Sequence, residues 1–148
     1  MSTIPSLSGN YMLGCAVIAW AAAQLAKCIV KWIATRKFDP ERLVGAGGMP
    51  SAHTAMVCSL ALAAVRSVGP GSPIFAVCFM FACVVIYDAM GVRRAAGEHG
   101  KRLNQMSDAI ELEEDGEEVA ELQEKLGHTP LEVLGGALLG ILVPMIIV

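Results

Sequence analysis

Residues 47–53, with sequence GGMPSAH, bring glycines, a hydroxyl and an imidazole to the start of a predicted helix. Free backbone N–H groups at a helix N-terminus point toward one spot, and the helix dipole adds partial positive charge there, so the N–H region of Gly48 can bind an anion. Ser51 would add a hydroxyl donor, and His53 would pass a proton to or from the bound group. A helix cap that follows a glycine hinge explains the same residues without any ligand.

Two adjacent arginines, Arg93 and Arg94, stand at the end of another apolar stretch, shortly after Asp88. A guanidinium group offers a planar fork of donors that matches phosphate oxygens. An acid so close to an apolar span usually has a partner, so we expect Asp88 to support one of the cationic side chains. Contact with lipid headgroups is the alternative explanation for the arginine pair.

His128 and Glu132 open the last apolar segment and are four residues apart, which places them on one face of a helix that includes both. A carboxylate beside an imidazole selects its tautomer and raises its basicity, as an activated histidine nucleophile requires. We therefore predict a contact between Glu132 and His128. A capped helix start with an acid in its first turn is the alternative.

Three more cations, Lys27, Lys31 and Arg36, lie near the end of the first apolar segment. Lys27 and Lys31 share a helical face, because four residues make about one turn. They are candidates to bind the same anion, and the alternative is that they reach toward lipid headgroups.

The elements that must position these residues are apolar helices, because 55% of the chain is hydrophobic and its charges are segregated. The windows free of Asp, Glu, Lys and Arg are residues 1–26, 43–65, 67–87 and 133–148. Each approaches the roughly 20 apolar residues that cross a bilayer core, although the last is short. We therefore expect an all-α fold, a polytopic membrane bundle of about four transmembrane helices, in a multi-pass integral membrane protein. The chain has no internal repeat, so we expect a single domain over residues 1–148.

Turn residues and charges set the expected bounds of these helices. The sequence predicts helices over residues 10–35, from 50 or 51 to 68, over 74–91 and from 130 onward. Residues 92–127 hold most of the remaining charge, including an acidic run at 111–118. We expect this polar segment to be partly helical and to lie outside the bilayer.

Four spans would bring the first and third interhelical links to one membrane face, and the turn near Gly69 with both termini to the other. All of the candidate anion-binding residues then fall on one face. Of the 11 Lys and Arg residues, Arg66 is the one that lies toward the opposite face. The positive-inside rule therefore predicts that the face with the candidate site is cytoplasmic.

The motifs together resemble those of the type-2 phosphatidic acid phosphatase superfamily, which also contains vanadate-dependent haloperoxidases. Residues 50–53, PSAH, are similar to its Pro-Ser-Gly-His motif. Arg93 matches the arginine of its Ser-Arg motif, and residues 128–132, HTPLE, match its His-x-x-x-Asp motif with Glu for Asp. The chain resembles the superfamily's divergent branch most closely. The stretches that carry this resemblance are QLAK at 24–27, GGMPS at 47–51, DAMGVRR at 88–94 and GH at 127–128.

The first superfamily motif is matched loosely, because no Lys stands at the usual spacing from an Arg-Pro pair. Lys27 and Arg36 are the best matches for its cations, with Lys31 and Arg42 behind them.

The third motif is divided, because His128 lies far beyond Arg93 in the chain. His99 instead follows Arg93 at the spacing usual in the superfamily. Position 103, where the acid partner of His99 would stand, is Leu. We therefore favour His128 as the nucleophile and keep His99 as the alternative.

The resemblance implies a phosphatase that hydrolyses a phosphate monoester of a lipid or prenyl-type alcohol through a phosphohistidine at His128. Glu132 would orient His128, and His53 would protonate the leaving alcohol and then activate water. Transition-state charge on the phosphate oxygens would be stabilised by Lys27, Arg36, Gly48, Ser51, Arg93 and Arg94, with Asp88 in support. The scheme requires no metal and no cofactor.

A non-catalytic membrane protein that binds a lipid phosphate, as a carrier, scaffold or regulator, is the alternative from a different functional class. Release of inorganic phosphate would separate the two. A haloperoxidase is a weaker third option, because it would need vanadate at His128 in a membrane setting. We expect membrane lipids around the protein and no nucleic-acid partner. Because the superfamily core has six helices, a second copy would complete the pocket of this shorter chain.

Overall fold

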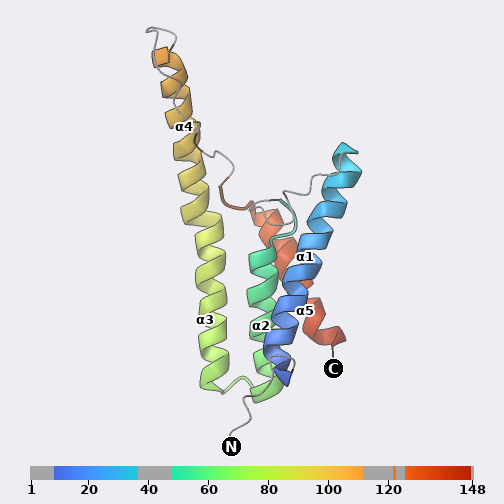
Figure 1. Ribbon diagram of the computed structural model, residues 1–148. Helices are drawn as coiled ribbons and strands as arrows, with labels where there is room; N and C mark the ends of the chain where they lie inside the picture. The colour runs from blue at the N-terminus through green and yellow to red at the C-terminus, as the bar shows by residue number, and fades with distance from the viewer. Residues whose placement is uncertain (1–8, 37–47, 112–121, 123–125, 148) are drawn as a thin grey trace, which may run out of the picture.

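The structure, a computed structural model, describes residues 9–36, 48–111, 122 and 126–147, and the regular elements in this part of the chain are helical. In chain order they are α1 (Tyr11–Thr35), α2 (Ala52–Val68), α3 (Pro73–Tyr87), the π-helical turn η3 (Asp88–Val92), α4 (Arg93–Glu111) and α5 (Pro130–Ile146). The predicted all-α bundle is therefore confirmed, and the chain adds one feature to it, the long helix that α3, η3 and α4 form together (Figure 1).

Short polar side chains set the starts of these helices, as expected for N-cap residues. Asn10 caps α1, where its side-chain oxygen accepts a hydrogen bond from Leu13 N at 3.1 Å. Ser72 caps α3 and Thr129 caps α5, and in both helices the next residue is a proline. At the other end of α1, Arg36 adopts a left-handed conformation with φ of 55°, which terminates the helix.

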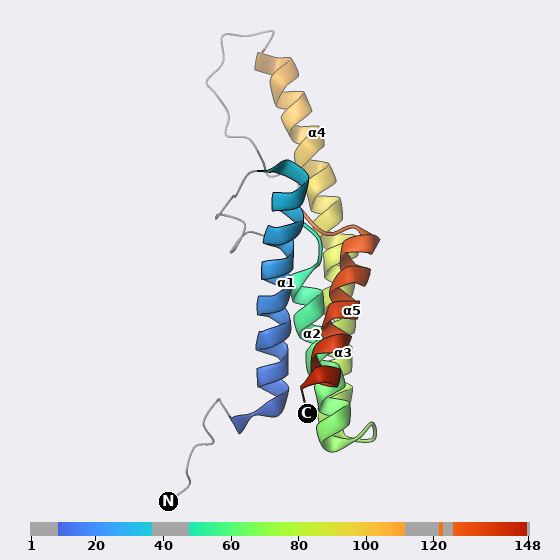
Figure 2. The ribbon, with the colours of Figure 1, turned by 90° about the vertical axis from the view of Figure 1, so that its right-hand side faces the viewer.

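The third helix does not end at residue 91, as the sequence predicted. It passes through η3 without a break and continues as α4, so that apolar α3 and charged α4 form one rod (Figures 1 and 2). The prediction failed because a change from apolar to polar composition does not stop a helix when no breaker or cap stands at the change. Most of the acidic run at 111–118 lies outside the described residues.

Small side chains form the core and allow the helices to approach closely. Helix α2 is central and packs against α1, α3 and α5. The buried cluster between α1, α2 and α5 consists of Cys15, Ala19, Ala23, Ala52, Ala55, Ala63 and Val143. Packing through small residues is typical of helices in a bilayer, where burial of large apolar groups gives little driving force.

Helix α5 approaches α2 most closely at two glycines. A Cβ atom at Gly136 would collide with the carbonyl oxygen of Ser51, and one at Gly140 would collide with that of Ala55. The two glycines are four residues apart and therefore face α2 together. This contact holds the start of α5 beside the start of α2, which places residues 51–53 and 128–132 near each other.

The connections follow the predicted topology. The end of α1 and the starts of α2 and α5 lie toward one end of the bundle, from which α4 projects, and the tight α2–α3 turn lies at the other end (Figures 1 and 2). Tyr11 Oη donates to the carbonyl oxygens of Pro144 and Ile147 at 3.1 and 3.0 Å, which ties the start of α1 to the end of α5 at the same end as that turn.

Two helices of the described chain are long and apolar enough to cross a membrane, over Tyr11–Ile33 and within Pro73–Ser107. Helices α2 and α5 are also apolar but only 17 residues long. At 1.5 Å per residue each is about 25 Å long, slightly less than the roughly 30 Å hydrocarbon core, a mismatch that local thinning of the bilayer accommodates.

Candidate active site

The site lies at the end of the bundle where the sequence predicted it, and the cap of α2 forms its base. Ser51 is fully buried, and its hydroxyl oxygen accepts hydrogen bonds from Thr54 Oγ1 at 2.9 Å and Thr54 N at 3.4 Å. Its own backbone N–H donates to the carbonyl oxygen of Glu132 at 2.9 Å. Ser51 is therefore the cap of α2, and its backbone N–H is engaged with Glu132. The predicted contact between its hydroxyl and an anion stays a prediction.

The π-helical turn positions His128 from the other side. The N–H of Arg93 donates to the carbonyl oxygen of Asp88, five residues earlier, rather than to that of Ala89. The Ala89 carbonyl is thereby released from the helical pattern. It accepts a hydrogen bond from the backbone N–H of His128 at 3.0 Å. The turn thus supplies the acceptor that fixes the His128 backbone on the long helix.

Gly127 allows this contact, because it lies directly against the backbone of the long helix. Its φ is +86°, and a Cβ atom there would lie 2.5 Å from Arg94 N and 2.7 Å from Arg94 Cα. Any other residue would be strained in this conformation and would also push the chain away from Arg94. The Gly-His pair is therefore needed for the close approach of His128 to η3.

The acid and the two arginines of η3 and α4 form separate ion pairs. Asp88 accepts a hydrogen bond from Arg93 Nε within η3, which is the support that we expected from this acid. Arg94 instead faces Glu98 on α4, with 3.6 Å between Nε and Oε1. The structure thus directs Arg93 and Arg94 to different sides of the long helix.

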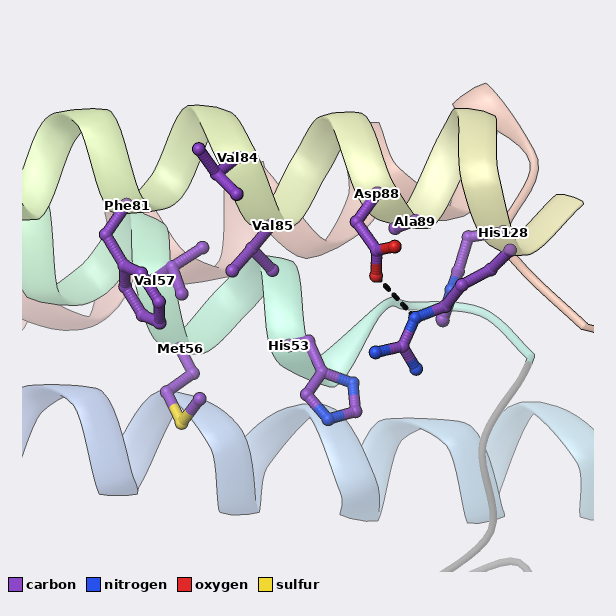
Figure 3. Close-up of a pocket in the computed structure, with 10 residues that line it drawn as sticks. His53, Met56, Val57, Phe81, Val84, Val85, Asp88, Ala89 and His128 are labelled. Atoms are coloured by element: carbon purple, nitrogen blue, oxygen red, sulfur yellow. Dashed lines mark hydrogen bonds and ion pairs between the residues drawn. The ribbon is translucent and has the colours of Figure 1, made fainter.

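A cavity of about 240 Å³ lies between α2 and the long helix, with His128 at its edge (Figure 3). Its polar lining residues are His53, Asp88, Arg93 and His128. Its apolar lining residues are Met56, Val57, Phe81, Val84, Val85 and Ala89. In Figure 3 the labelled His53, Asp88 and His128 lie toward one end, and Met56, Val57 and Phe81 lie toward the other. The cavity therefore joins a polar end to an apolar arm.

His128 is buried, with 6% of its surface exposed, and its two ring nitrogens have no hydrogen-bond partner among the described residues. Burial lowers the pKa of His128 below its ordinary value of 6.5. The carboxylate of Glu132 acts in the opposite direction, and the charges of Lys27 and Arg93 lower the pKa further. The imidazole is therefore neutral near pH 7, and one of its nitrogens carries a free lone pair.

The predicted contact between Glu132 and His128 is wrong. His128 precedes α5 rather than sharing a face of it, so the four-residue spacing does not bring the two side chains together. Glu132 Oε2 accepts from Thr129 N at 2.8 Å, while Glu132 N donates to Thr129 Oγ1 at 3.3 Å, which is a capping box. Glu132 acts on His128 through its charge and not through a hydrogen bond.

The remaining predicted cations differ in their relation to the cavity. Lys27 is buried in α1, with 6% of its surface exposed, and it is near enough for its charge to act on His128. Arg36 is exposed and lines a separate cavity with Trp32 and Ile33. Arg94 is exposed and, like Gly48 and Ser51, is not part of the cavity between α2 and the long helix.

A model of the divergent PAP2 family, a branch of the type-2 phosphatidic acid phosphatases, matches residues 8–143. The chain belongs to this family. It is 34% identical to the Bacillus subtilis (strain 168) protein described as "Uncharacterized membrane protein YuiD", over 93% of this chain and 94% of that protein. No solved structure matches the chain.

This divergent PAP2 protein brings together the residues that carry its family motifs. His53 from the second motif, Arg93 from the third and His128 from the divided end of the third line one cavity. His99, the alternative nucleophile, is exposed on α4 and does not line it. The geometry of this family member therefore favours His128.

The apolar arm of the cavity was not identified from the sequence. Its residues follow helical spacing from the polar ones, since Met56 and Val57 stand three and four residues after His53. On the long helix, Phe81, Val84 and Val85 stand one to two turns before Asp88. The sequence of this divergent PAP2 protein contains this spacing. It does not predict the cavity, because in a helix that is apolar on every side such spacing does not distinguish the face toward a cavity from the face toward lipid.

Proposed function

We propose that this protein is a membrane-embedded phosphatase that hydrolyses the phosphate monoester of a lipid or prenyl-type alcohol. The observation that carries the proposal is the cavity in which His53, Arg93 and His128 adjoin an apolar arm between α2 and α3. A phosphate at the polar end would meet two imidazoles and a guanidinium. The attached apolar chain would lie along Met56, Val57 and Phe81, where it would displace little water.

In the first step, the free lone pair of the His128 imidazole attacks phosphorus. A P–N bond forms while the bond between phosphorus and the alcohol oxygen breaks. His53, in its protonated form, donates a proton to the leaving oxygen, so that a neutral alcohol departs. The two ring nitrogens of His128 support this role, because they have no hydrogen-bond partner in the described ranges, and a buried polar atom without a partner costs free energy that substrate would recover.

In the second step, water replaces the alcohol. His53, now neutral, takes a proton from the water as its oxygen attacks the phosphohistidine. The P–N bond breaks, inorganic phosphate leaves, and both histidines return to their starting states.

Positive charge at the polar end would stabilise the transition state. Asp88 accepts the hydrogen bond from Arg93 Nε, and the two terminal NH₂ groups of the Arg93 guanidinium would donate to phosphate oxygens. Lys27 adds a buried positive charge, and Glu132 would offset the charge that develops on His128. We assign no phosphate contact to Arg36, Gly48, Ser51 or Arg94, because none of them lines the cavity.

The active face would be cytoplasmic. Arg93, Arg94, Lys101 and Arg102 all lie on the described long helix at or beyond the site, whereas Arg66 ends α2 at the other face. The positive-inside rule relates such an excess of Lys and Arg to the cytoplasmic side.

The test is release of inorganic phosphate by the purified protein in detergent, supplied with phosphatidate, a prenyl phosphate and the water-soluble p-nitrophenyl phosphate. We expect turnover of at least one lipid substrate and inhibition by vanadate, which mimics five-coordinate phosphorus. His128→Ala and His53→Ala should each lower the rate by at least 100-fold. His99→Ala is the matched control and should keep more than half of the activity.

Full activity in His128→Ala with loss in His99→Ala would transfer the nucleophile to His99. If the protein binds these substrates but releases phosphate from none of them, the result would support a second candidate function. In that case the protein is a lipid-phosphate-binding carrier, scaffold or regulator. One observation favours this alternative: the Glu132 carboxylate is engaged in a capping box and does not orient His128.

A further inference from the structure

The long helix extends beyond the other described helices of the bundle. Helix α4 continues directly from α3 and η3 and projects past the ends of α1, α2 and α5 (Figures 1 and 2). Among the described elements its contacts are almost confined to η3, the turn that precedes it. Its residues include Arg93, Arg94, Glu98, Lys101 and Arg102, so this part of the helix lies in water.

Two large apolar side chains nevertheless face outward on α4. Leu103 is 52% exposed and Met106 is 62% exposed. They are three residues apart and thus lie on one face, one turn from each other. An aqueous helix that presents such a pair on one face, opposite Arg94 and Lys101, has the pattern of a helix that packs against another protein.

The pair continues a line of exposed residues along the whole long helix. The line consists of Val77, Met80, Val84, Tyr87, Val92, Ala96, His99, Leu103 and Met106. We call these nine residues the seam. Its steps alternate between three and four residues, which is the spacing of the a and d positions in a coiled coil. The one exception is the five-residue step from Tyr87 to Val92.

That exception coincides with the π-helical turn. Residues 88–92 form η3, in which hydrogen bonds span five residues instead of four. The wider turn absorbs one additional residue. Val92 therefore falls on the same side of the helix as Tyr87, and the seam runs straight from α3 into α4.

Other parts of the chain contact different faces of this helix. Ala82, the buried residue of α3, lies on the face toward α2. On α4, Asn104 exchanges two hydrogen bonds with the backbone of Leu122, at 2.9 and 3.0 Å. At roughly 100° per residue, Asn104 points well away from Leu103 and from Met106. The described part of the chain therefore leaves the seam open.

We propose that the seam is the interface of a homodimer, in which the long helices of two copies form a parallel coiled coil. Two copies inserted in one bilayer have the same orientation, so a twofold axis along the membrane normal pairs each helix with itself in parallel. Each seam residue then faces its own equivalent. Lipid can cover the α3 part of the seam, but a second helix is needed to cover Leu103 and Met106 in water.

The residues that flank the seam are compatible with this pairing. Next to Leu103 and Met106 the flanking residues are Arg102 and Ser107, and next to Ala96 and His99 they are Ala95 and Gly100. In a parallel dimer these positions meet across the interface without placing two like charges opposite each other. Val84 belongs both to the seam and to the lining of the cavity, so the partner helix would lie beside the candidate active site.

Disulfide cross-linking in native membranes tests the dimer. The native cysteines Cys15, Cys28, Cys58, Cys78 and Cys83 are first replaced by Ala, and Leu103→Cys is then introduced and oxidised. Residues that face each other across a twofold axis can meet the Cα separation of about 4.4–6.8 Å that a disulfide needs. We expect more than half of the protein to run as a covalent dimer. Lys101→Cys, about 160° from Leu103 around the same helix, is the matched control and should remain monomeric.

A second measurement does not depend on cysteine chemistry. The purified protein should have the mass of a dimer by native mass spectrometry, and the double variant Leu103→Glu/Met106→Glu should shift it to monomer at unchanged helical content. Equal cross-linking at Leu103→Cys and Lys101→Cys, or a monomeric native protein, would overturn the proposal. Protection of Leu103→Cys from a water-soluble maleimide without cross-linking would also overturn it, because lipid would then cover the seam. These outcomes are independent of phosphatase activity.

Discussion

His128 is fixed through its backbone, while its imidazole forms no hydrogen bond with the part of the chain that the structure describes. The N–H of the residue donates to Ala89 O, and Gly127 lies against the backbone of Arg94. The two ring nitrogens are buried and have no hydrogen-bond partner among the described residues. In the proposed mechanism, such an arrangement would position the nucleophile and keep it neutral, because burial lowers the pKa of His128 more strongly than the charge of Glu132 raises it.

The titration of His128 can be observed directly. In the variant His53→Gln/His99→Gln, carried with a tag that lacks histidine, His128 is the one remaining histidine. Its ring-carbon NMR signals should titrate with a pKa below 6.5, because burial disfavours the imidazolium. The His128 imidazole is then neutral at pH 7 and remains so somewhat below pH 6.5. It becomes protonated, and so loses its free lone pair, as the pH falls through the lowered pKa.

Inorganic phosphate should raise this pKa by stabilising the imidazolium, since an anion at the polar end favours the charged form. Sulfate at equal ionic strength, added to the Arg93→Gln form of the same variant, controls for general salt effects. A pKa above 6.5 without phosphate would contradict the burial of His128.

At the scale of elements, glycines decide how closely the helices and links approach. Gly127 and Gly69 both have positive φ, of +86° and +82°. A Cβ atom at Gly69 would meet nothing within 4 Å, whereas one at Gly127 would collide with Arg94. The two positions thus share a positive φ and differ in the steric clash that a Cβ atom would meet.

Gly127→Ala and Gly69→Ala should therefore separate positioning from strain. Each loses about 1–3 kcal/mol of stability because Ala is disfavoured at positive φ. Gly127→Ala should in addition lower kcat by at least 10-fold with little change in KM, since it displaces His128 from η3. Phosphate release measured at saturating and at limiting substrate gives both constants. Equal kcat values for the two variants would show that the contact with Arg94 does not position His128.

The contact between α2 and α5 makes a second matched pair possible. A Cβ atom at Gly140 would collide with the backbone of Ala55, whereas one at Gly14 on α1 would meet nothing within 4 Å. Gly140→Ala should cost about 1–3 kcal/mol and lower the Tm in detergent, because the helices must move apart. Gly14→Ala should be neutral or raise the Tm, since Ala stabilises a helix interior by about 0.5–1 kcal/mol relative to Gly. The opposite order of Tm values would mean that α5 does not pack on α2 at Gly140.

At the scale of the whole molecule, the bundle has two different ends, one with the candidate site and one with the α2–α3 turn. The first carries His53, Arg93 and His128, and the second carries the α2–α3 turn with the ends of α1 and α5 that Tyr11 connects. Under the proposed function, this separation would place the polar end of the cavity at the membrane surface and its apolar arm within the bilayer. A lipid substrate would then reach the site without leaving the membrane.

Single-cysteine labelling checks the orientation of these two ends. In a background without native cysteines, Ser72→Cys at the α2–α3 turn should react with a membrane-impermeant maleimide in intact bacterial cells. Gln105→Cys on α4 should react only after the cells are permeabilised, because the positive-inside rule places α4 in the cytoplasm. The reverse pattern would place the site on the outer face, and labelling of both in intact cells would contradict the four-span topology.

The sequence by itself determined the helices, the end of the bundle that carries the site, and the motif residues His53, Arg93 and His128. These follow from hydropathy, from the segregation of charge, from turn residues and from motif spacing, all of which act over short stretches of the chain. Only the tertiary structure decided that Glu132 caps α5, that the Ala89 carbonyl holds His128, and that the long helix continues through η3. It also decided that an apolar arm joins the site between α2 and α3. The hydrogen bond between His128 and Ala89 and the cavity join residues far apart in the chain, which local spacing does not specify. The capping box of Glu132 is local, and the structure decided only between the two roles that the sequence offered for this acid.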